Sequence, residues 1–434
     1  MFSRIARVLW GNLTEDELKK FGLLSVTFLF IIGSYWLMRV LKDALFMDIV
    51  GEAYIPRAKM LSVALLIPLI VIYSKLVDLC EKQKLFYVIC SFYATLFLGI
   101  TYFLAHPIHG LANTEASPDR ILGWVIYLGV ETFGSLVVAL FWSFVASSVD
   151  TASAKRGYGL IIGGAQIGSI AGPTLATFAE TIGLVNLLAI VSAGIFVVPF
   201  LIMLFVRKYP ASPSLNVAGE KKNTGPLEGL KLLFSKPYLI GILGVATLYE
   251  VIGTIMDYQL KVTAKATYGS ATKVASFLGT FGQCANGLAL VFALVGTSFV
   301  IRRFGLTFCL VMFPLAVSSV ILYVWWSPSL WTLFGAMVTI KGLSYALNNP
   351  CKEVMYIPTS KDVKFKAKGW IDAFGSRSAK ASGSVITDAF RHSAADLMFF
   401  GSLISLGIVG IWIIAALYVG RRNEKLIKEG AIIQ

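Results

Sequence analysis

Basic side chains recur inside stretches of this sequence that are otherwise apolar. An ionised side chain in the interior of a bilayer costs at least about 2.5 kcal/mol on insertion scales, so each one needs a carboxylate, a wet cavity or a ligand. Ammonium and guanidinium groups are the usual protein ligands of phosphate. The candidates for binding a polyanion are therefore the six cations within predicted hydrophobic spans: Arg39, Lys42, Lys261, Lys341, Arg377 and Lys380.

The spacing of these cations places them on shared helical faces. Tyr35, Arg39 and Lys42 follow one another at i, i+4 and i+7, and Arg377 and Lys380 are three residues apart. Residues with these separations project from the same side of an α-helix. Each set therefore presents its charge in one direction.

Carboxylates in the same spans nearly balance the cations. Asp257 precedes Lys261 by four residues in the favourable acid-first order, and Arg39 has Asp43 at i+4, so these cations have a structural pairing as an alternative to a ligand. Both alternatives stay open. The acids concerned are Asp43, Glu131, Glu250, Asp257 and Asp372.

Neither Lys42 nor Lys380 has an acid four residues away on its own helix. A buried ammonium without a neighbouring carboxylate needs its counter-charge from elsewhere. These two lysines are accordingly the strongest candidates for holding a ligand's phosphate.

Composition shows what must position these side chains. Of 434 residues, 57% are hydrophobic and 14% charged, and the mean hydropathy is +0.76, whereas soluble domains carry roughly 25% charged residues. Several apolar runs reach the roughly 18 residues that a bilayer-spanning helix needs. Lipid permits only helices or closed barrels, and continuous runs indicate helices. We expect an all-α membrane protein with about twelve transmembrane helices.

The apolar runs divide into two sets of six. The first set covers 21–47, 59–79, 85–105, 121–148, 158–180 and 184–206, and the second covers 238–263, 273–299, 305–325, 330–349, 368–389 and 397–420. A Pro-, Ser-, Gly- and Lys-rich stretch between the sets is typical of a linker. The predicted organisation is an N-terminal segment (1–20), a six-helix bundle (21–206), a linker (207–237), a second six-helix bundle (238–420) and a tail (421–434).

The two sets resemble each other at a constant offset. Parallel repeats of six helices are typical of the major-facilitator architecture, which holds its substrate near the midplane. Lys42 and Lys261 occupy equivalent places in the first helix of each set. The matching residues are Asp150, Gly157, Tyr158 and Gly163 in one set and Asp362, Gly369, Trp370 and Gly375 in the other.

Charge distribution predicts the orientation. With a cytoplasmic N-terminus, about 26 lysines and arginines fall on the cytoplasmic side and about six on the other, so both termini are expected in the cytoplasm. The net charge of +14 reflects this asymmetry and not nucleic-acid binding, for which no basic and aromatic motif is present. Without a Ser- and Arg-rich transit segment, we expect a bacterial inner membrane protein, acting as a monomer.

Motifs for other chemistries are absent from the sequence. The five cysteines are widely spaced and form no disulfide or zinc pattern, and His106 and His109 are a weak metal signal. No HExxH, aspartate-rich metal motif or phosphate-binding GxxxxGK[ST] loop occurs. We therefore expect no metal, no cofactor and no enzymatic activity.

Several segments at these same positions resemble one known family. The segments are Arg39-Val-Leu-Lys42-Asp43, Glu131 in the fourth span, Glu250 in the seventh, Asn349-Pro350-Cys351-Lys352-Glu353-Val-Met-Tyr356-Ile-Pro358, and Lys368-Gly369-Trp370-Ile-Asp372 leading to Lys380. They are similar to the ATP/ADP translocase family of plastids and intracellular bacteria. The resemblance implies exchange of ATP and ADP, with Lys42, Glu131, Glu250 and Lys380 involved in transport.

These observations combine into one hypothesis and two alternatives. The hypothesis is an ATP/ADP antiporter working by alternating access. The alternatives are proton-coupled uptake of other nucleotides and a major-facilitator permease for another organic anion. In the hypothesis, phosphates are held by Arg39 and Lys42 from one half and Lys261, Arg377 and Lys380 from the other, and the gating or coupling groups are Glu131, Glu250, Asp43 and Asp257.

Overall fold

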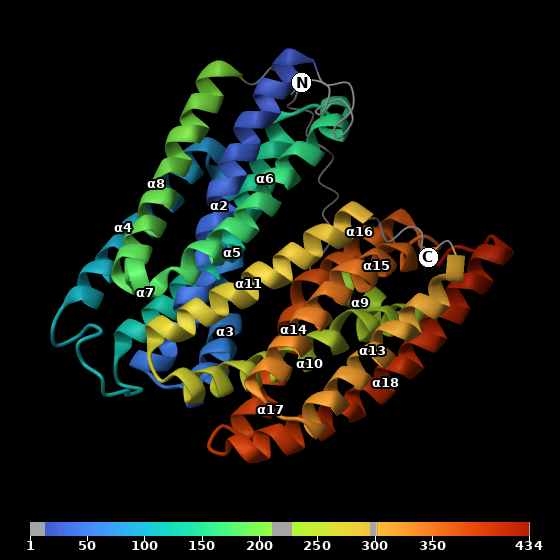
Figure 1. Ribbon diagram of the computed structural model, residues 1–434. Coiled ribbons are helices and arrows are strands. Elements are labelled where there is room, and N and C mark those ends of the chain that lie inside the picture. Colours follow the sequence, from blue (N-terminus) through green and yellow to red (C-terminus); the bar gives the residue numbers. More distant parts are fainter. Residues whose placement is uncertain (1–13, 211–227, 296–300, 302, 434) are drawn as a thin grey trace. The chain divides into compact units, whose positions relative to one another are not determined.

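The computed structural model describes residues 14–210, 228–295, 301 and 303–433, and this part of the chain is almost entirely helical (Figure 1). The β-type pairing within these ranges is one isolated bridge between Thr359 and Ile433. The predicted all-α class is therefore confirmed.

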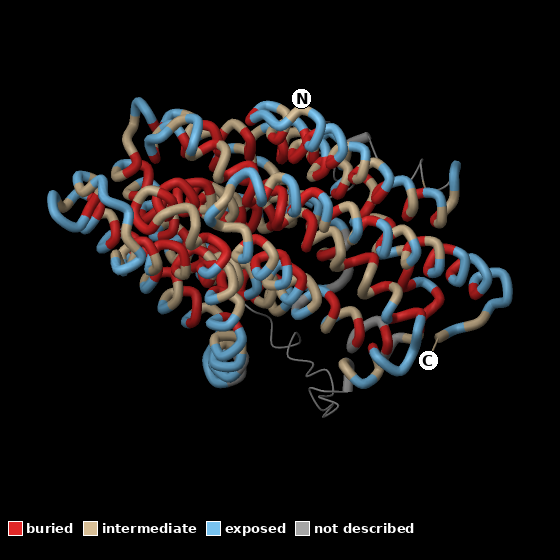
Figure 2. Tube along the Cα trace, turned by 90° about the horizontal axis from the view of Figure 1, so that it is seen from below, coloured by how far each residue is buried: buried red, intermediate tan, exposed pale blue. Residues whose placement is uncertain are grey.

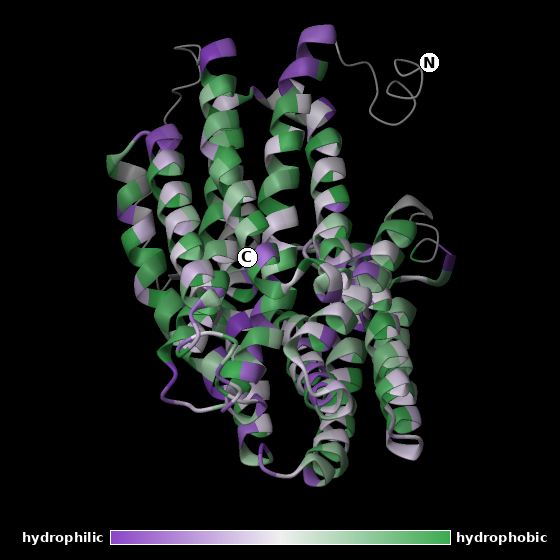
Figure 3. Ribbon diagram, turned by 60° about the vertical axis from the view of Figure 1, so that its left-hand side comes forward, coloured by the Kyte–Doolittle hydropathy of each residue, from purple (hydrophilic) through white to green (hydrophobic). Residues whose placement is uncertain are grey.

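Within the described residues, eleven helices are long and apolar enough to cross a membrane. Hydrophobic residues occur along the length of most helices (Figure 3). The predicted span 368–389 is not among the eleven, because it is too polar: it carries Lys368, Asp372, Arg377, Lys380 and Asp388. It is built from three consecutive helical pieces, α16 (Lys361–Trp370), η4 (Ile371–Gly375) and α17 (Ser376–Ala389). The expectation of a helical membrane protein of about twelve spans is confirmed, with eleven candidate spans in the described residues and the predicted span 368–389 formed by shorter helical pieces.

The chain forms two compact units, and the first contains Met1–Glu52, Ala64–Gly219 and Tyr268–Asn286. It includes the later part of α3 (Ile55–Leu79) and the earlier part of α11 (Ala271–Val295). Its other helices are α2 (Glu15–Ile49), α4 (Lys82–Ala105), α5 (Ile121–Ser148), α6 (Thr151–Thr177), α7 (Ala179–Ile182) and α8 (Leu184–Lys208).

The long helix α2 lies against α6, and α4 lies against α8 (Figure 1). The α2–α6 approach depends on glycine. A Cβ atom at Gly168 would collide with the Leu29 backbone, and one at Gly172 would collide with the backbone of Gly33. Small residues four apart let membrane helices approach closely. This packing fixes α2, which carries Arg39 and Lys42, within the unit.

The second unit contains Ala53–Val63, Glu220–Thr267 and Gly287–Gln434. It includes η1 (Glu52–Tyr54) from Ala53 onward, the first turns of α3 and the later part of α11. Its remaining elements are α9 (Glu228–Ser235), α10 (Pro237–Tyr268), α13 (Leu306–Trp326), α14 (Leu330–Leu343), η3 (Ser344–Asn348), α15 (Asn349–Met355), α16, η4, α17 and α18 (Ala394–Glu429).

Buried aromatic contacts hold this second unit together. α13 packs along α18, where Phe313 meets Trp412 edge to face at 5.1 Å between ring centroids. The Tyr238 hydroxyl of α10 donates to the Met355 carbonyl at 2.7 Å and accepts a hydrogen bond from Asn423. Figure 2 shows that buried residues alternate with exposed ones along the helices, as expected for helices with one face in a bundle.

Two of the helical pieces in this unit, η3 and η4, are π-helical turns. η3 ends one residue before Asn349 and Pro350. Proline has no N–H to donate to the carbonyl four residues earlier, so the α-helical ladder is interrupted there. The wider turn lets the Asn349 N–H bind the Ser344 carbonyl instead. Such π turns are frequent at functional sites, and these two flank segments for which the sequence predicts a function.

Candidate functional site

The first charged cluster lies in unit 1 and is centred on Lys42 of α2. Its ammonium group donates a hydrogen bond to Glu131 Oε1 on α5. It also lies 3.6 Å from Asp43 Oδ1 and 4.1 Å from the centroid of the Tyr127 ring. Lys42 and Asp43 are 3% and 4% exposed. One buried ammonium is thus compensated by two carboxylates and a π face.

Glu131 is the accessible member of this cluster, because its side chain is 30% exposed whereas that of Lys42 is 4% exposed. One turn earlier on α2, the Arg39 guanidinium lies 4.9 Å from the centroid of the Trp36 ring.

The second cluster lies in unit 2 and is centred on Asp257 of α10. Its Oδ2 atom accepts hydrogen bonds from Lys261 at 2.6 Å and from Lys59 of α3 at 2.9 Å. The ammonium of Lys341 lies within electrostatic range of the same carboxylate. The Asp257–Lys261 pairing predicted from the acid-first spacing is confirmed.

Lys59 is a member of this cluster that sequence reasoning missed. It opens a predicted span, where it counts as a non-cytoplasmic loop cation. Its position in an α3 turn brings it to a carboxylate almost two hundred residues later in the chain. Residue spacing within one helix carries no signal for such a contact.

The third cluster, also in unit 2, joins α10 to α17. Lys380 Nζ lies 3.8 Å from Glu250 Oε2, and the two side chains are 52% and 27% exposed. This distance is too long for a hydrogen bond. Lys380 is therefore ion-paired but still open to solvent, and the half-buried Arg377 lies one turn before it.

The sequence places no acid four residues from Lys42 or Lys380 on the same helix. The structure supplies carboxylates from other helices: Lys42 pairs with Glu131 and Lys380 with Glu250. The physical reason is that buried charges in a bundle find partners across helices as readily as along them.

Lys352 is a further cation of the third cluster. It lies on α15 directly after the π turn η3, and is within electrostatic range of Glu250, Asp372 and Lys380. In the sequence, Lys352 belongs to the segment that begins with Asn349 and resembles a known family. The cost of an intramembrane charge does not single it out, because it lies outside the predicted spans.

The remainder of that segment anchors α15 to α16. Lys368 donates to both carboxylate oxygens of Glu353, at 2.6 and 2.7 Å, and its ammonium lies 5.5 Å from the Tyr356 ring centroid. Burial raises the pKa of the Tyr356 hydroxyl. The Glu353–Lys368 pair is largely exposed on its acidic side and has a structural role at the helix ends.

Metal chemistry finds no support in the described ranges, where no group of three or more His, Cys, Asp or Glu side chains could hold a metal ion. The chemistry of the three clusters is that of ammonium, guanidinium and carboxylate groups placed within membrane helices. Such groups can bind an anion and exchange it for an internal carboxylate.

Comparison with known families identifies the chain. The TLC ATP/ADP transporter family matches residues 1–422, which is nearly the whole sequence. The chain belongs to this family.

Curated relatives agree with membership in the TLC ATP/ADP transporter family. ADP,ATP carrier protein 2 of the chloroplast of Arabidopsis thaliana is 27% identical over 92% of this chain and 74% of its own length. ADP,ATP carrier protein 1 of Chlamydia muridarum is 26% identical over 96% and 90%. ADP,ATP carrier protein 3 of Rickettsia bellii is 22% identical over 98% and 99%.

Solved structures of transporters share the fold. The nucleoside transporter NupG has a TM-score of 0.65 at 14% identity, covering 93% of this chain and 99% of that structure. A bacterial homologue of the iron transporter ferroportin has a TM-score of 0.66 at 14% identity, covering 94% and 100%. These neighbours confirm the predicted major-facilitator-like architecture.

Family membership settles three expectations. This member of the TLC ATP/ADP transporter family is an integral membrane transporter and not an enzyme. The family resemblance inferred from the Arg39–Asp43 and Asn349–Pro358 segments is confirmed. Nucleotide transport is accordingly the activity that the three charged clusters have to explain.

Proposed function

We propose that this chain exchanges ATP for ADP by alternating access, and that intramembrane lysines and arginines hold the nucleotide phosphates. The observation that carries the proposal is Lys42, an ammonium 3% exposed within a membrane helix and paired with the more accessible Glu131. Membership in a family of ATP/ADP transporters supplies the substrate class.

In unit 1 the phosphate would bind to Lys42 and Arg39. Phosphate and the Glu131 carboxylate compete for the same ammonium, so Glu131 serves as an internal substitute for the substrate. Removing the counter-charge of a buried lysine without replacing it is strongly unfavourable. The Glu131 side chain is then released only when a phosphate takes its place, which couples the motion of this glutamate to substrate binding. Asp43 remains beside Lys42 and limits the net charge there.

In unit 2 the phosphate would bind to Lys380, Arg377 and Lys261. Lys380 is the most accessible of them, and its 3.8 Å separation from Glu250 is a weak attachment that a phosphate can replace. Lys261 shares Asp257 with Lys59, so this carboxylate plays the part that Glu131 plays in unit 1. Glu250 and Asp257 are therefore the gating or coupling groups of this unit.

Exchange follows from the substitution of carboxylates for phosphates. A ligand shifts a conformational equilibrium only through different affinities for its states. If the internal ion pairs hold the empty carrier in one state and phosphate replaces them, crossing requires a nucleotide in each direction. Proton-coupled uptake would instead release Glu131 or Glu250 by protonation.

Reconstitution in liposomes distinguishes these mechanisms. Vesicles are preloaded with ADP, GDP, phosphate or buffer, and uptake of labelled ATP, GTP, UTP and NAD is followed at two pH values. Exchange predicts ATP uptake that depends on internal ADP and is insensitive to a pH gradient. Uptake into empty vesicles driven by a pH gradient would contradict it, and uptake of none of these nucleotides would contradict nucleotide transport altogether.

We further propose that the carrier is a monomer in a bacterial inner membrane, with both termini in the cytoplasm. The asymmetry of lysine and arginine in the loops supports this orientation, and bacterial relatives support the location. Labelling of single cysteines introduced near each terminus with a membrane-impermeant maleimide tests the orientation, and light scattering of the purified protein tests the oligomeric state.

A further inference from the structure

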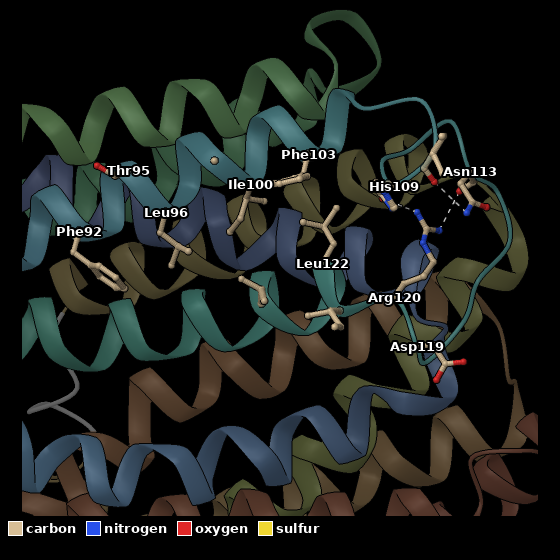
Figure 4. A pocket seen from close by; sticks show the side chains of 14 residues that line it. Phe92, Thr95, Leu96, Ile100, Phe103, His109, Asn113, Asp119, Arg120 and Leu122 are labelled. Atoms are coloured by element: carbon tan, nitrogen blue, oxygen red, sulfur yellow. Dashed lines mark hydrogen bonds between the residues drawn. The ribbon is translucent and has the colours of Figure 1, made fainter.

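A concave groove of about 790 Å³ opens on unit 1 between α4 and α5. Figure 4 shows Phe92, Leu96, Ile100 and Phe103 following one another along α4, with Leu122 opposite them on α5. Phe92 and Phe103 are 60% and 49% exposed although both are large apolar side chains. The groove has the volume of a ligand pocket, which is typically about 300–1,000 Å³.

The connection between α4 and α5 closes one end of this groove with a polar rim. Arg120 organises the rim: its Nη1 atom donates to the carbonyls of Asn113 and Glu115, and its Nη2 atom donates to those of His109 and Gly110, at 2.7 to 3.1 Å. This connection is joined to the end of α2 by a hydrogen bond from the Ser117 N–H to the Ile49 carbonyl. The rim is therefore a built structure, fixed to the unit.

The guanidinium of Arg120 places a positive charge at the mouth of the groove. In the described part of the chain it binds four carbonyl dipoles and forms no salt bridge with a carboxylate. Asp119, the neighbouring acid of the rim, points away from Arg120 and interacts with Ser117 (Figure 4). The groove thus combines a long apolar body with a polar end, where Arg120 supplies the positive charge and the carboxylate of Asp119 is turned away from it.

We propose that this groove binds one phospholipid with an anionic head group. Its acyl chain lies along Phe92, Leu96, Ile100 and Phe103, and its phosphate lies at the rim beside Arg120. The lining is apolar along α4 and polar at the rim, which fits an amphiphile, and the positive charge of Arg120 complements the phosphate. The exposed apolar side chains along α4 suit an acyl chain, whereas a nucleotide would find too few polar partners there.

Gly99 provides a sharp test because it lines the groove and a Cβ atom there would meet nothing within 4 Å. Gly99→Phe fills the groove without a collision at the backbone. Gly410 on α18 is the matched control: it is exposed on a membrane helix of the other unit and its Cβ position is equally open. Gly410→Phe adds the same ring outside the groove.

The experiment uses phosphatidylglycerol with a photoreactive diazirine on its acyl chain, in the full-length protein in liposomes, with peptides mapped by mass spectrometry. We expect wild-type labelling to concentrate on residues 92–125, and to exceed labelling by the matching phosphatidylcholine probe. Gly99→Phe should reduce it roughly tenfold, which corresponds to about 1.4 kcal/mol of lost affinity. Gly410→Phe should leave it unchanged.

Labelling spread evenly over lipid-facing helices of the wild-type protein would overturn the proposal, and needs no variant to be folded. Equal labelling by the two head groups would overturn the role of Arg120, and unchanged labelling of folded Gly99→Phe would overturn the position of the acyl chain. None of these results depends on nucleotide transport.

Discussion

The ammonium of Lys42 on α2 donates a hydrogen bond to Glu131 on α5, and this contact joins two charged side chains of opposite sign inside one membrane unit. The pair is asymmetric in accessibility, since the lysine is buried and the glutamate is about one third exposed. A buried ion pair is weak evidence for stability, but breaking one side of it is costly. The contact therefore yields a prediction about stability that is independent of transport.

Lys42→Met and Glu131→Gln should each lower the thermal unfolding midpoint in detergent, because each removes the hydrogen-bonded counter-charge from the other side chain. The double variant should lose less than the sum of the two, with an interaction energy of about 0.5–3 kcal/mol as for residues in direct contact. The measurement is a double-mutant cycle on the purified protein.

The exposed pair Lys84 and Glu81 is the matched control for this cycle. Its side chains are 67% and 59% exposed and 3.5 Å apart, and exposed pairs contribute between about 0 and 1 kcal/mol. Lys84→Met and Glu81→Gln should be additive. Additive effects for Lys42 and Glu131 as well would show that their contact carries no energy.

Lys380→Ala should impair nucleotide exchange without affecting insertion or the unfolding midpoint, because the side chain is 52% exposed and only weakly paired. Loss of one charge-assisted contact to phosphate, at about 1.5–3 kcal/mol, corresponds to a rise in KM for ATP of roughly tenfold to a hundredfold. Lys380→Arg should retain part of the affinity. Uptake by proteoliposomes at several ATP concentrations provides the measurement.

Lys428→Ala on the exposed end of α18 controls for the loss of one positive charge on the protein, and its KM should be that of the wild type. Wild-type transport by both Lys380→Ala and Lys42→Ala would refute the assignment of these two lysines to the phosphate site.

These sites show how far sequence reasoning extends. Apolar runs predict the helices, because a bilayer forces each run to satisfy its own backbone. The cost of an intramembrane charge is enough to identify Arg39, Lys42, Lys261, Lys341, Arg377 and Lys380 from the sequence alone. An ion pair within one helix can also be predicted from the sequence, as Asp257 and Lys261 show, because the helical period determines which residues meet.

Ion pairs between two helices cannot be predicted from the spacing of residues in the sequence. The contacts of Lys42 with Glu131, Lys380 with Glu250 and Lys59 with Asp257 depend on how helices pack, which no spacing rule within one helix contains. The π turns are likewise missed, since Pro350 after η3 and Gly375 at the end of η4 mark possible helix breaks but do not predict a π turn.

Asp257→Asn should destabilise unit 2, because it removes the carboxylate that Lys261 and Lys59 share and leaves two neighbouring ammonium groups without it. Both ammonium groups lie within hydrogen-bond distance of the same oxygen atom, so they repel each other once residue 257 is uncharged. The second change Lys59→Met should restore part of the unfolding midpoint by removing one of the two charges. Thermal unfolding of the wild type, Asp257→Asn and the double variant provides the measurement. A double variant no more stable than Asp257→Asn would contradict the sharing of Asp257 by Lys59 and Lys261.

Pro350→Ala should convert the π turn η3 into α-helix. The alanine supplies the N–H that proline lacks, so residue 350 can donate to the Ala346 carbonyl and the Asn349 N–H need no longer reach Ser344. Closing the turn rotates Lys352 and the rest of α15 relative to α14, and so moves Lys352 away from Glu250 and Lys380. We expect slower amide hydrogen exchange over residues 344–352 together with reduced nucleotide transport.

Ala346→Gly is the companion variant, because it alters the same turn but leaves Pro350 in place, and amide hydrogen exchange should stay fast in this variant. Faster or unchanged amide exchange in Pro350→Ala would show that the proline does not maintain the π turn.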